Sequence, residues 1–294
     1  MTPRAPFTIQ LPRNRTLHLG SRTLVMGILN ITPDSFADGG LYLDPGAAEA
    51  AALDMEARGA DIIDVGGEST RPGSDTISAE AEIARVQPVL ARLSRSLKIP
   101  ISIDTSKAAV ADLAMQEGAS LINDVTALKG GSPGAVSYHA SLAEIAARSG
   151  AGLILMHTRG CSRDMYKEAV YASVTGEIKD ELRASLDCAL SAGVRRESVI
   201  LDPGLGFAKR PEHSYAALTA LPELATLGCP LLVGPSRKSF LSSAIGERSP
   251  AERDMATAAS VAAAVLFGAH IVRVHNVPAM VDVVRVADAI RQQC

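Results

Sequence analysis

Cysteine is scarce in this chain of 294 residues, and its four cysteines lie far apart in the sequence. None of them belongs to a CxxC pair, so the spacing indicates neither a disulfide framework nor a cysteine zinc site. The four are Cys161, Cys188, Cys229 and Cys294. We therefore predict that the protein works in a reducing cytoplasm.

An excess of charge of one sign is also lacking. The chain has 29 Lys and Arg residues against 32 Asp and Glu residues, and its net charge is -3. Because the positive and negative charges are nearly equal in number, the chain has no general attraction to nucleic acid or to a membrane surface, and we expect neither as a partner. Any site for an anion must therefore be local.

Long hydrophobic runs are missing as well. Pro, Arg and Asn interrupt the apolar residues of the first twenty positions, so we expect no export signal there. The most apolar stretch, residues 256–269, contains Thr257 and Ser260 and is shorter than the roughly 20 apolar residues that cross a bilayer. We predict that this stretch is a buried helix.

The composition is that of a folded chain, with 47% hydrophobic and 21% charged residues. No linker and no shift in composition divides the sequence. We predict a single domain over residues 1–294, in which residues 1–20 are an N-terminal extension. This extension has the pattern of a β-hairpin with strands over residues 7–10 and 16–19.

Short apolar segments alternate with longer alanine-rich helical segments over the rest of the chain. The predicted strands cover residues 24–29, 61–65, 99–104, 121–124, 153–156, 199–201, 231–233 and 271–274, and the first helices cover 47–58, 79–97 and 108–117. Uniformly apolar strands are typical of a parallel sheet covered on both faces. Eight such units predict an α/β fold of the (β/α)8 (TIM) barrel type. A doubly wound open sheet is the alternative, although no GxGxxG follows the first strand.

Nearly every predicted strand ends in polar residues or in a Gly/Pro turn that carries them. In order, these residues are Asn30, Glu68-Ser69-Thr70-Arg71, Asp104, Asn123-Asp124, His157, Asp202, Ser236-Arg237-Lys238, and Arg273 with His275. In a closed barrel the strand ends meet on the face that carries active sites, so we predict one pocket there. Capping of the following helix explains any single one of these residues equally well.

Two carboxylates and an amide are expected in the middle of the barrel mouth, at Asp104, Asn123 and Asp202. Such a set of acceptors suits a flat heterocycle rich in N–H donors, such as an aminopyrimidinone edge. We expect Lys238 to supply the local counter-charge, although a purely structural Asp–Lys pair has the same pattern. Met156 and Phe207 have the size to sandwich a flat ring, or are simply core residues.

Cations gather after the last two predicted strands, where barrels commonly bind phosphate: Arg237, Lys238, Arg273 and His275. A phosphorylated substrate is our hypothesis. Asn30 offers one oxygen to a Mg²⁺ ion that bridges phosphate oxygens, and no HExxH, EF-hand or His cluster indicates a tighter metal site. We expect His157 to be a core or rim histidine rather than a ligand, and Arg237 to point outward while Lys238 points inward.

Two long segments rich in Gly, Pro, Ser and Asp, residues 30–40 and 66–75, follow the first two predicted strands and carry Phe36 and Arg71. They are suited to close as lids that exclude water from a reactive cation. Each alone is equally explained as an ordinary connection between a strand and a helix.

A series of sequence blocks resembles the motifs of the dihydropteroate synthase family over most of the chain, from Val25 to Asp288. In order, the blocks are MGILNITPDSFADGG, GADIIDVGGESTRPG, ISIDTSK, LINDV, LILMH, VILDPGLGFAK, LLVGPSRKSFL and GAHIVRVHNV. The resemblance implies a (β/α)8 barrel, a homodimer, a Mg²⁺ cofactor and a target of sulfonamides. It also implies a transferase of folate biosynthesis that joins 7,8-dihydropterin-6-ylmethyl diphosphate to p-aminobenzoate, with release of pyrophosphate.

The resemblance also implies roles for individual residues. The pterin-binding set is Asp104, Asn123, Met156, Asp202, Phe207, Gly234 and Lys238. The diphosphate set is Asn30, Thr70, Arg71, Arg273 and His275, with Asn30 as the metal ligand. The p-aminobenzoate set is Pro33, Phe36, Thr70, Arg71, Pro72, Ser236 and Lys238, with Asp34 on the same loop. Those with a catalytic role are Asp104, Lys238, Arg273 and His275.

Two other functions have part of this pattern. A methyltransferase that acts on a methylated folate would keep the pterin-binding Asp and Asn residues but has no need of the cations at Lys238, Arg273 and His275. A non-catalytic relative would bind pterin only. The helix over residues 256–267 has few charges and suits a dimer interface, although an internal contact of the barrel would have the same composition.

Overall fold

The predicted apolar segments form parallel strands that lie side by side in one sheet. The computed structural model describes residues 4–32, 44–70, 73–129, 138, 140–160, 166–167 and 169–293. Within these ranges the sheet consists of β3 (Leu24–Asn30), β4 (Ile62–Gly66), β5 (Ile101–Asp104), β6 (Leu121–Asp124), β7 (Gly152–Met156), β8 (Val199–Asp202), β9 (Leu232–Val233) and β10 (Ile271–Val274). Every predicted strand is present, with ends shifted by at most two residues.

The sheet closes on itself between β8 and β9. Its strand order is β8-β7-β6-β5-β4-β3-β10-β9, and a parallel bridge joins Leu201 of β8 to Leu231. The backbone N–H of Leu201 also donates to the carbonyl oxygen of Pro230, over 3.0 Å. Because an open sheet would keep two unpaired edges, the doubly wound alternative is wrong and the predicted barrel is confirmed.

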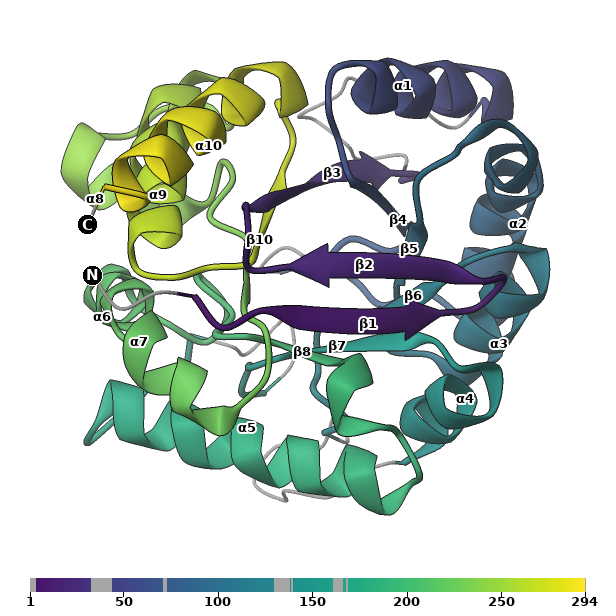
Figure 1. Cartoon of the computed structure of the whole chain (residues 1–294), viewed down its shortest axis with the longest axis horizontal. Helices are drawn as coiled ribbons and strands as arrows, with labels where there is room; N and C mark the ends of the chain where they lie inside the picture. The colour runs from purple at the N-terminus through teal and green to yellow at the C-terminus, as the bar shows by residue number, and fades with distance from the viewer. Residues whose placement is uncertain are drawn as a thin grey trace.

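Helices surround the strands (Figure 1). They are α1 (Pro45–Ala57), α2 (Ala79–Ser96), α3 (Ala108–Glu117), α4 (Ser141–Ser149), α5 (Val174–Ser191), α6 (Pro211–Thr219), α7 (Leu221–Leu224), α8 (Ser242–Ile245), α9 (Asp254–Leu266) and α10 (Val277–Arg291). Side-chain caps fix where several of them begin: Asp44, Ser78 and Asn276 each accept a backbone N–H of the first turn of α1, α2 and α10.

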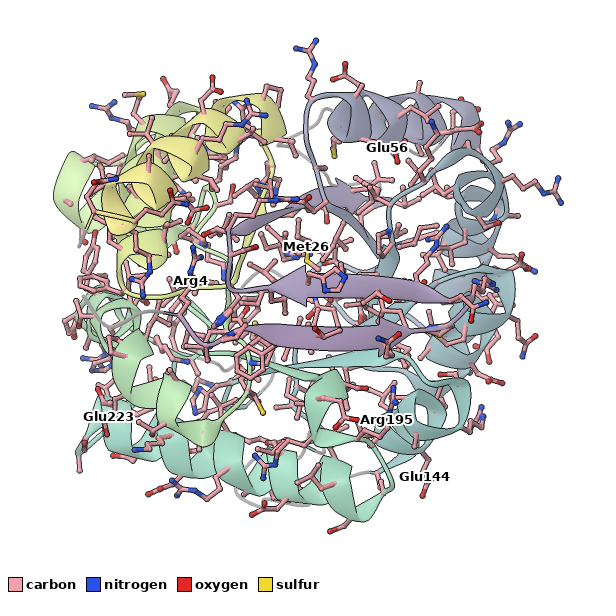
Figure 2. All side chains as sticks on the ribbon, in the orientation of Figure 1. Arg4, Met26, Glu56, Glu144, Arg195 and Glu223 are labelled. Atoms are coloured by element: carbon pink, nitrogen blue, oxygen red, sulfur yellow. The ribbon has the colours of Figure 1, made fainter. Side chains whose placement is uncertain are left out.

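The N-terminal hairpin closes one end of the barrel. Its strands, β1 (Phe7–Leu11) and β2 (Arg15–Leu19), pair antiparallel and lie across the barrel opening in Figure 1. Ile9, Leu11, Leu17 and Leu19 of the hairpin are buried against the inner residues of the barrel. Figure 2 shows Met26, an inner residue of the barrel, near the middle of the molecule beside the hairpin, whereas Glu144 and Glu223 lie on the periphery.

The barrel interior changes from apolar to polar along the strands. The inner layer in contact with the hairpin consists of Met26, Ile62, Leu121, Ile154, Ile200, Leu232 and Ile271. Because side chains of a strand alternate between the two faces, the residues two positions further along also point inward. On β4, β6, β8 and β10 these residues are Asp64, Asn123, Asp202 and Arg273. The chain therefore places a polar layer at the end of the barrel away from the hairpin.

The apolar stretch over residues 256–269 forms most of α9. Val261, Ala264 and Val265 on one side of this helix are buried, whereas Met255 at its start is 83% exposed. No helix among the residues with described coordinates is both long and apolar enough to span a bilayer.

We expect the packing of the hairpin to contribute to stability. Substitution Ile9→Ala removes three carbon atoms from a side chain that is fully buried against the barrel, which costs about 2 to 5 kcal/mol of unfolding free energy. Urea unfolding measures the loss. The control is Thr8→Ala on the exposed face of the same strand. Equal stability of the two variants would contradict this account of the hairpin.

Candidate active site

The carboxyl ends of the barrel strands border a cavity of about 560 Å³. The predicted site residues that line it are Asn30, Thr70, Asp104, Phe207, Gly234, Ser236, Lys238, Arg273 and His275. Asn123, Met156 and Asp202 lie deeper in the polar layer and are at most 4% exposed. Pro33, Asp34, Phe36, Arg71 and Pro72 lie outside the described residues. Every predicted site residue that the structure describes is therefore at this end of the barrel.

Arg273 bridges two carboxylates in the polar layer. Its Nε donates to Oδ2 of Asp64 over 2.6 Å, and its Nη2 donates to Oδ2 of Asp104 over 2.7 Å. The Nδ2 group of Asn123 donates to the same oxygen of Asp64 over 3.0 Å. Burial lowers the pKa of Arg273, but the charges of Asp64 and Asp104 raise it by more, so the pKa lies above its usual value. The guanidinium is therefore charged and held in one orientation.

Asp64 was missed by the sequence analysis. It lies within β4 rather than at its end, and its side chain is fully buried. The available signal was a single carboxylate between apolar residues in the segment IIDVG, two positions after Ile62, where the alternation of the strand directs it inward. A buried charge at such a position needs a partner, and here the partner is Arg273.

Two buried carboxylate oxygens in the polar layer lack a hydrogen-bond donor from the part of the chain that the structure describes. Oδ1 of Asp104 and Oδ1 of Asp64 have no hydrogen-bond partner among the described residues. Burial raises the pKa of Asp104 to about 7, although the charge of Arg273 acts in the opposite direction. Because buried acceptors without a donor are costly, these oxygens favour a ligand that brings N–H groups.

Arg273 pairs directly with Asp104, and the expected counter-charge Lys238 acts mainly on Asp202. Lys238 Nζ instead donates to the carbonyl oxygen of Leu205 over 2.5 Å and lies 4.5 Å from the centre of the Phe207 ring. Burial lowers the pKa of Lys238 to about 8, and the charge of Asp202 opposes this shift. The reason is topological: Arg273 points into the barrel from β10, while Lys238 approaches from the loop after β9.

Helix capping does not explain the carboxylates at the strand ends. The residue at the cap position of α3 is Lys107, and that of α6 is Arg210. Asp202 accepts the backbone N–H of Gly204 over 2.7 Å within its own loop. Burial raises the pKa of Asp202, while Lys238 lowers it.

The loop after β8 is fixed by a second residue that the sequence analysis missed, Lys209. Its Nζ is fully buried and contacts Nδ1 of His157 at 2.8 Å and the carbonyl oxygen of Phe207 at 3.0 Å. Gly204 on this loop has a φ of +67°, and a Cβ there would lie 2.0 Å from the carbonyl oxygen of His157. The close approach of the loop to β7 therefore requires glycine.

His157 is a buried histidine outside the cavity lining, as expected. Burial and then the charge of Lys209 lower its pKa to about 3, so the ring is neutral. Its Nε2 lies 3.2 Å from Oε2 of Glu181 on α5. The ring is thus held between two partners and is not directed at a ligand.

Ser236 and His275 connect the ends of β9 and β10. Oγ of Ser236 accepts the backbone N–H of His275 over 3.1 Å and lies 2.9 Å from its Nδ1. Arg237 points away to α9, where its Nε donates to Oδ1 of Asp254 over 2.7 Å. The two side chains diverge as predicted, but Arg237 also lines the cavity and does not point outward.

Asn30 lies at the end of β3 beside Asp104. A Cβ at Gly66 between them would be 3.6 Å from Oδ1 of Asn30 and 3.7 Å from Cβ of Asp104. No cluster of three His, Cys, Asp or Glu residues suited to a metal occurs within the described ranges. The remaining cavity residues include Tyr166 and Arg253, which belong to no sequence motif identified above.

Known proteins resemble the chain over nearly its whole length. The sequence profile of the family described as pterin binding enzyme matches residues 26–275. The dihydropteroate synthase of Synechocystis sp. is 45% identical over 97% of this chain and 96% of its own. A crystal structure of the Yersinia pestis dihydropteroate synthase with a sulfonamide drug is 38% identical, has a TM-score of 0.88 and covers 96% of this chain and 98% of that one. The Xanthomonas albilineans dihydropteroate synthase with 4-aminobenzoic acid is 35% identical, with a TM-score of 0.86 and coverage of 98% and 99%.

The raised pKa of Asp104 predicts a dependence of stability on pH. Between about pH 4 and pH 7 Asp104 keeps its proton in the folded protein and loses it in the unfolded chain. The unfolding free energy therefore falls as the pH rises through this window. Substitution Asp104→Asn mimics the neutral acid. When the pH is raised from about 5.5 to about 8, the unfolding free energy of the variant should therefore increase, relative to that of the unsubstituted protein, by on the order of 1 kcal/mol or more.

Urea unfolding at both pH values measures this gain. Asp112→Asn, at an exposed carboxylate on α3, is the control and should show no such change. A stability difference for Asp104→Asn that is independent of pH would show that the carboxyl does not titrate in this range.

Proposed function

Because this chain belongs to the dihydropteroate synthase family of pterin-binding enzymes, we propose that its barrel cavity is where 7,8-dihydropterin-6-ylmethyl diphosphate reacts with p-aminobenzoate. The products are 7,8-dihydropteroate and pyrophosphate, and the enzyme is a transferase. The identities to dihydropteroate synthases decide against the methyltransferase that shares part of the motif pattern. The observation that carries the proposal is the pair of unpartnered carboxylate oxygens held beside one arginine.

The pterin ring binds in the polar layer. Asp104 lines the cavity, and its Oδ1, unpartnered among the described residues, supplies an acceptor for the amino and N–H groups of the ring; Asp64 holds Arg273 behind it, and this arrangement supports the proposal. Asn123 and Asp202 extend the same layer, and Gly234 leaves room at the wall. Phe207 and Met156 cover the faces of the ring, and Lys238 lies over the Phe207 ring.

The diphosphate group lies toward β10 and the end of β3. Arg273 and His275 come from β10 and its end, Thr70 comes from the loop after β4, and all three line the cavity. The C–O bond between the pterin methylene carbon and the diphosphate breaks first, and the electron pair leaves with the oxygen. Arg273 stabilises the negative charge that develops there, while the carboxylate of Asp104 stabilises the positive charge that spreads over the ring.

p-Aminobenzoate then attacks the methylene carbon through its amine nitrogen, which loses a proton. Thr70, Ser236 and Lys238 are the described residues that we assign to its binding. Pro33, Phe36, Arg71 and Pro72 complete this assignment from outside the described residues. Sulfonamides are expected to compete at this subsite, a proposal supported by the complexes of relatives with a sulfonamide and with 4-aminobenzoic acid.

The residues of the cavity fit a Mg²⁺ ion that binds together with the diphosphate. Mg²⁺ usually takes one or two protein ligands and completes its shell with phosphate oxygens and water. Asn30 offers one side-chain oxygen near Asp104, and the described residues hold no denser cluster of ligands. When bound, the ion would neutralise charge on the leaving diphosphate.

We also propose that the chain forms one domain and acts as a homodimer in a reducing cytoplasm. The shared core of the hairpin and the barrel supports the single domain, and the free thiols of Cys188 and Cys229 support the reducing location. A groove between α9 and α10 is lined by apolar side chains, including Val286, which is 62% exposed, and Ile290, which is 49% exposed. This surface supports the dimer.

We expect Arg273→Met to abolish nearly all turnover. The variant loses the cation that stabilises the leaving diphosphate, so kcat should fall by at least about a hundredfold. Pyrophosphate release from the pterin diphosphate in the presence of p-aminobenzoate measures the rate. Arg148→Met, at an exposed ion pair on α4, is the matched control. Turnover of Arg273→Met at the rate of this control would refute the assigned role.

The metal assignment predicts a change in Mg²⁺ requirement. Substitution Asn30→Ala removes the proposed oxygen ligand, so the Mg²⁺ concentration that gives half of the maximal rate should rise at least about tenfold. Asn30→Asp retains an oxygen ligand and should remain near the unsubstituted value. Calorimetric titration of Mg²⁺ in the presence of pyrophosphate gives a second measurement. Equal Mg²⁺ dependence of all three proteins would remove Asn30 from the metal site.

A further inference from the structure

The loop between β4 and α2 is tied together at its base. Glu68 near its beginning accepts the backbone N–H of Ile77 near its end, with 2.8 Å between Oε1 and N. Oγ of Ser74 donates to the carbonyl oxygen of Ser69 over 2.6 Å. Glu68, Ser69 and Thr70 all line the cavity. The position of this edge of the cavity therefore depends on where the Glu68 carboxylate is held.

A lysine from outside the cavity holds that carboxylate. Nζ of Lys107, at the start of α3, lies 2.7 Å from Oε2 of Glu68 and 2.6 Å from Oε2 of Glu82 on α2. The Glu82 side chain is fully buried, and its second oxygen has no partner among the described residues. One ammonium group thus separates two carboxylates that would otherwise repel each other in a poorly solvated space.

The back of the loop is held independently of this lysine. Arg85 on α2 donates to the carbonyl oxygen of Gly67 over 2.9 Å. Gly67 itself packs so closely on α2 that a Cβ there would lie 2.6 Å from a methyl carbon of Val86. The start of the loop is therefore fixed to α2, and Lys107 controls the next residues, which face the cavity.

We propose that Lys107 is a positioning residue for p-aminobenzoate, which acts by anchoring Glu68 and so fixing Ser69 and Thr70 at the edge of the cavity. The proposal rests on the proposed function, because Thr70 is one of the residues assigned to that substrate. The pterin layer is built on other contacts, those of Arg273 with Asp64 and Asp104. Loss of the anchor should therefore weaken the binding of p-aminobenzoate and spare the binding of the pterin ring.

Two variants separate positioning from a purely structural role. Lys107→Met removes the ammonium group and leaves two facing carboxylates, so both the Tm and the binding of p-aminobenzoate should suffer. In Lys107→Met/Glu82→Met the buried carboxylate is removed too, and replacement of a buried ion pair by apolar residues of similar volume is often neutral. The Tm should then recover, whereas Glu68 still lacks its anchor.

The measurements are Tm, KM for p-aminobenzoate, kcat, and calorimetric affinity for a 7,8-dihydropterin without the diphosphate group to which Thr70 is assigned. In both Lys107 variants KM for p-aminobenzoate should rise between about tenfold and a hundredfold, as expected from a misplaced binding edge, while the pterin affinity stays unchanged. Glu82→Met alone keeps the contact of Lys107 with Glu68 and should keep its KM. Lys179→Met is the control, at a lysine on α5 with a similar side-chain exposure of 22%.

The proposal is overturned if KM returns to the unsubstituted value together with the Tm in the double variant, because Lys107 would then be structural only. An unchanged KM in both Lys107 variants overturns it as well. Failure of the proposed function is a different result: the unsubstituted enzyme itself would release no pyrophosphate that depends on p-aminobenzoate.

Discussion

The salt bridge of Arg273 with Asp64 and Asp104 is the interaction on which the site depends. Three charged groups are removed from water at one level of the barrel, at a cost on the order of several kcal/mol per ion. Their mutual contacts offset part of this cost, and the remaining negative charge leaves two carboxylate oxygens without a donor. Buried acceptors without a donor cost free energy. A ligand that brings N–H groups and develops positive charge reduces this cost.

The barrel separates stability from chemistry along its axis. At one end the hairpin packs on an apolar layer that includes Met26 and Ile62, and this layer carries hydrophobic free energy without any polar group to satisfy. Two residues further along β4, β6, β8 and β10, the inner positions are charged or amide side chains. The fold tolerates the free-energy cost of burying these polar groups because the apolar layer and the surrounding helices already determine the structure.

Lysines outside the cavity connect the loops to this framework. Lys209 joins the loop after β8 to the end of β7, and Lys107 joins the loop after β4 to α2 and α3. The Nζ atom of each of these lysines contacts several acceptors at once, so each helps to fix the loop beside it. The cavity is therefore shaped by residues that do not line it.

The sequence by itself determined the strands, the helices, the barrel and most of the residues at its mouth, because hydrophobic periodicity and polar strand ends are local signals. Tertiary structure alone decided which charges meet. The alternation of β4 directs Asp64 inward, but only the folded barrel shows that its partner is Arg273, and only the packing of α2 and α3 shows that Lys107 reaches Glu68. Arg273 forms the ion pair with Asp104, whereas the expected counter-charge Lys238 acts mainly on Asp202. Such pairings depend on the closure of the sheet, which brings β10 beside β3 and directs side chains from distant strands into one interior.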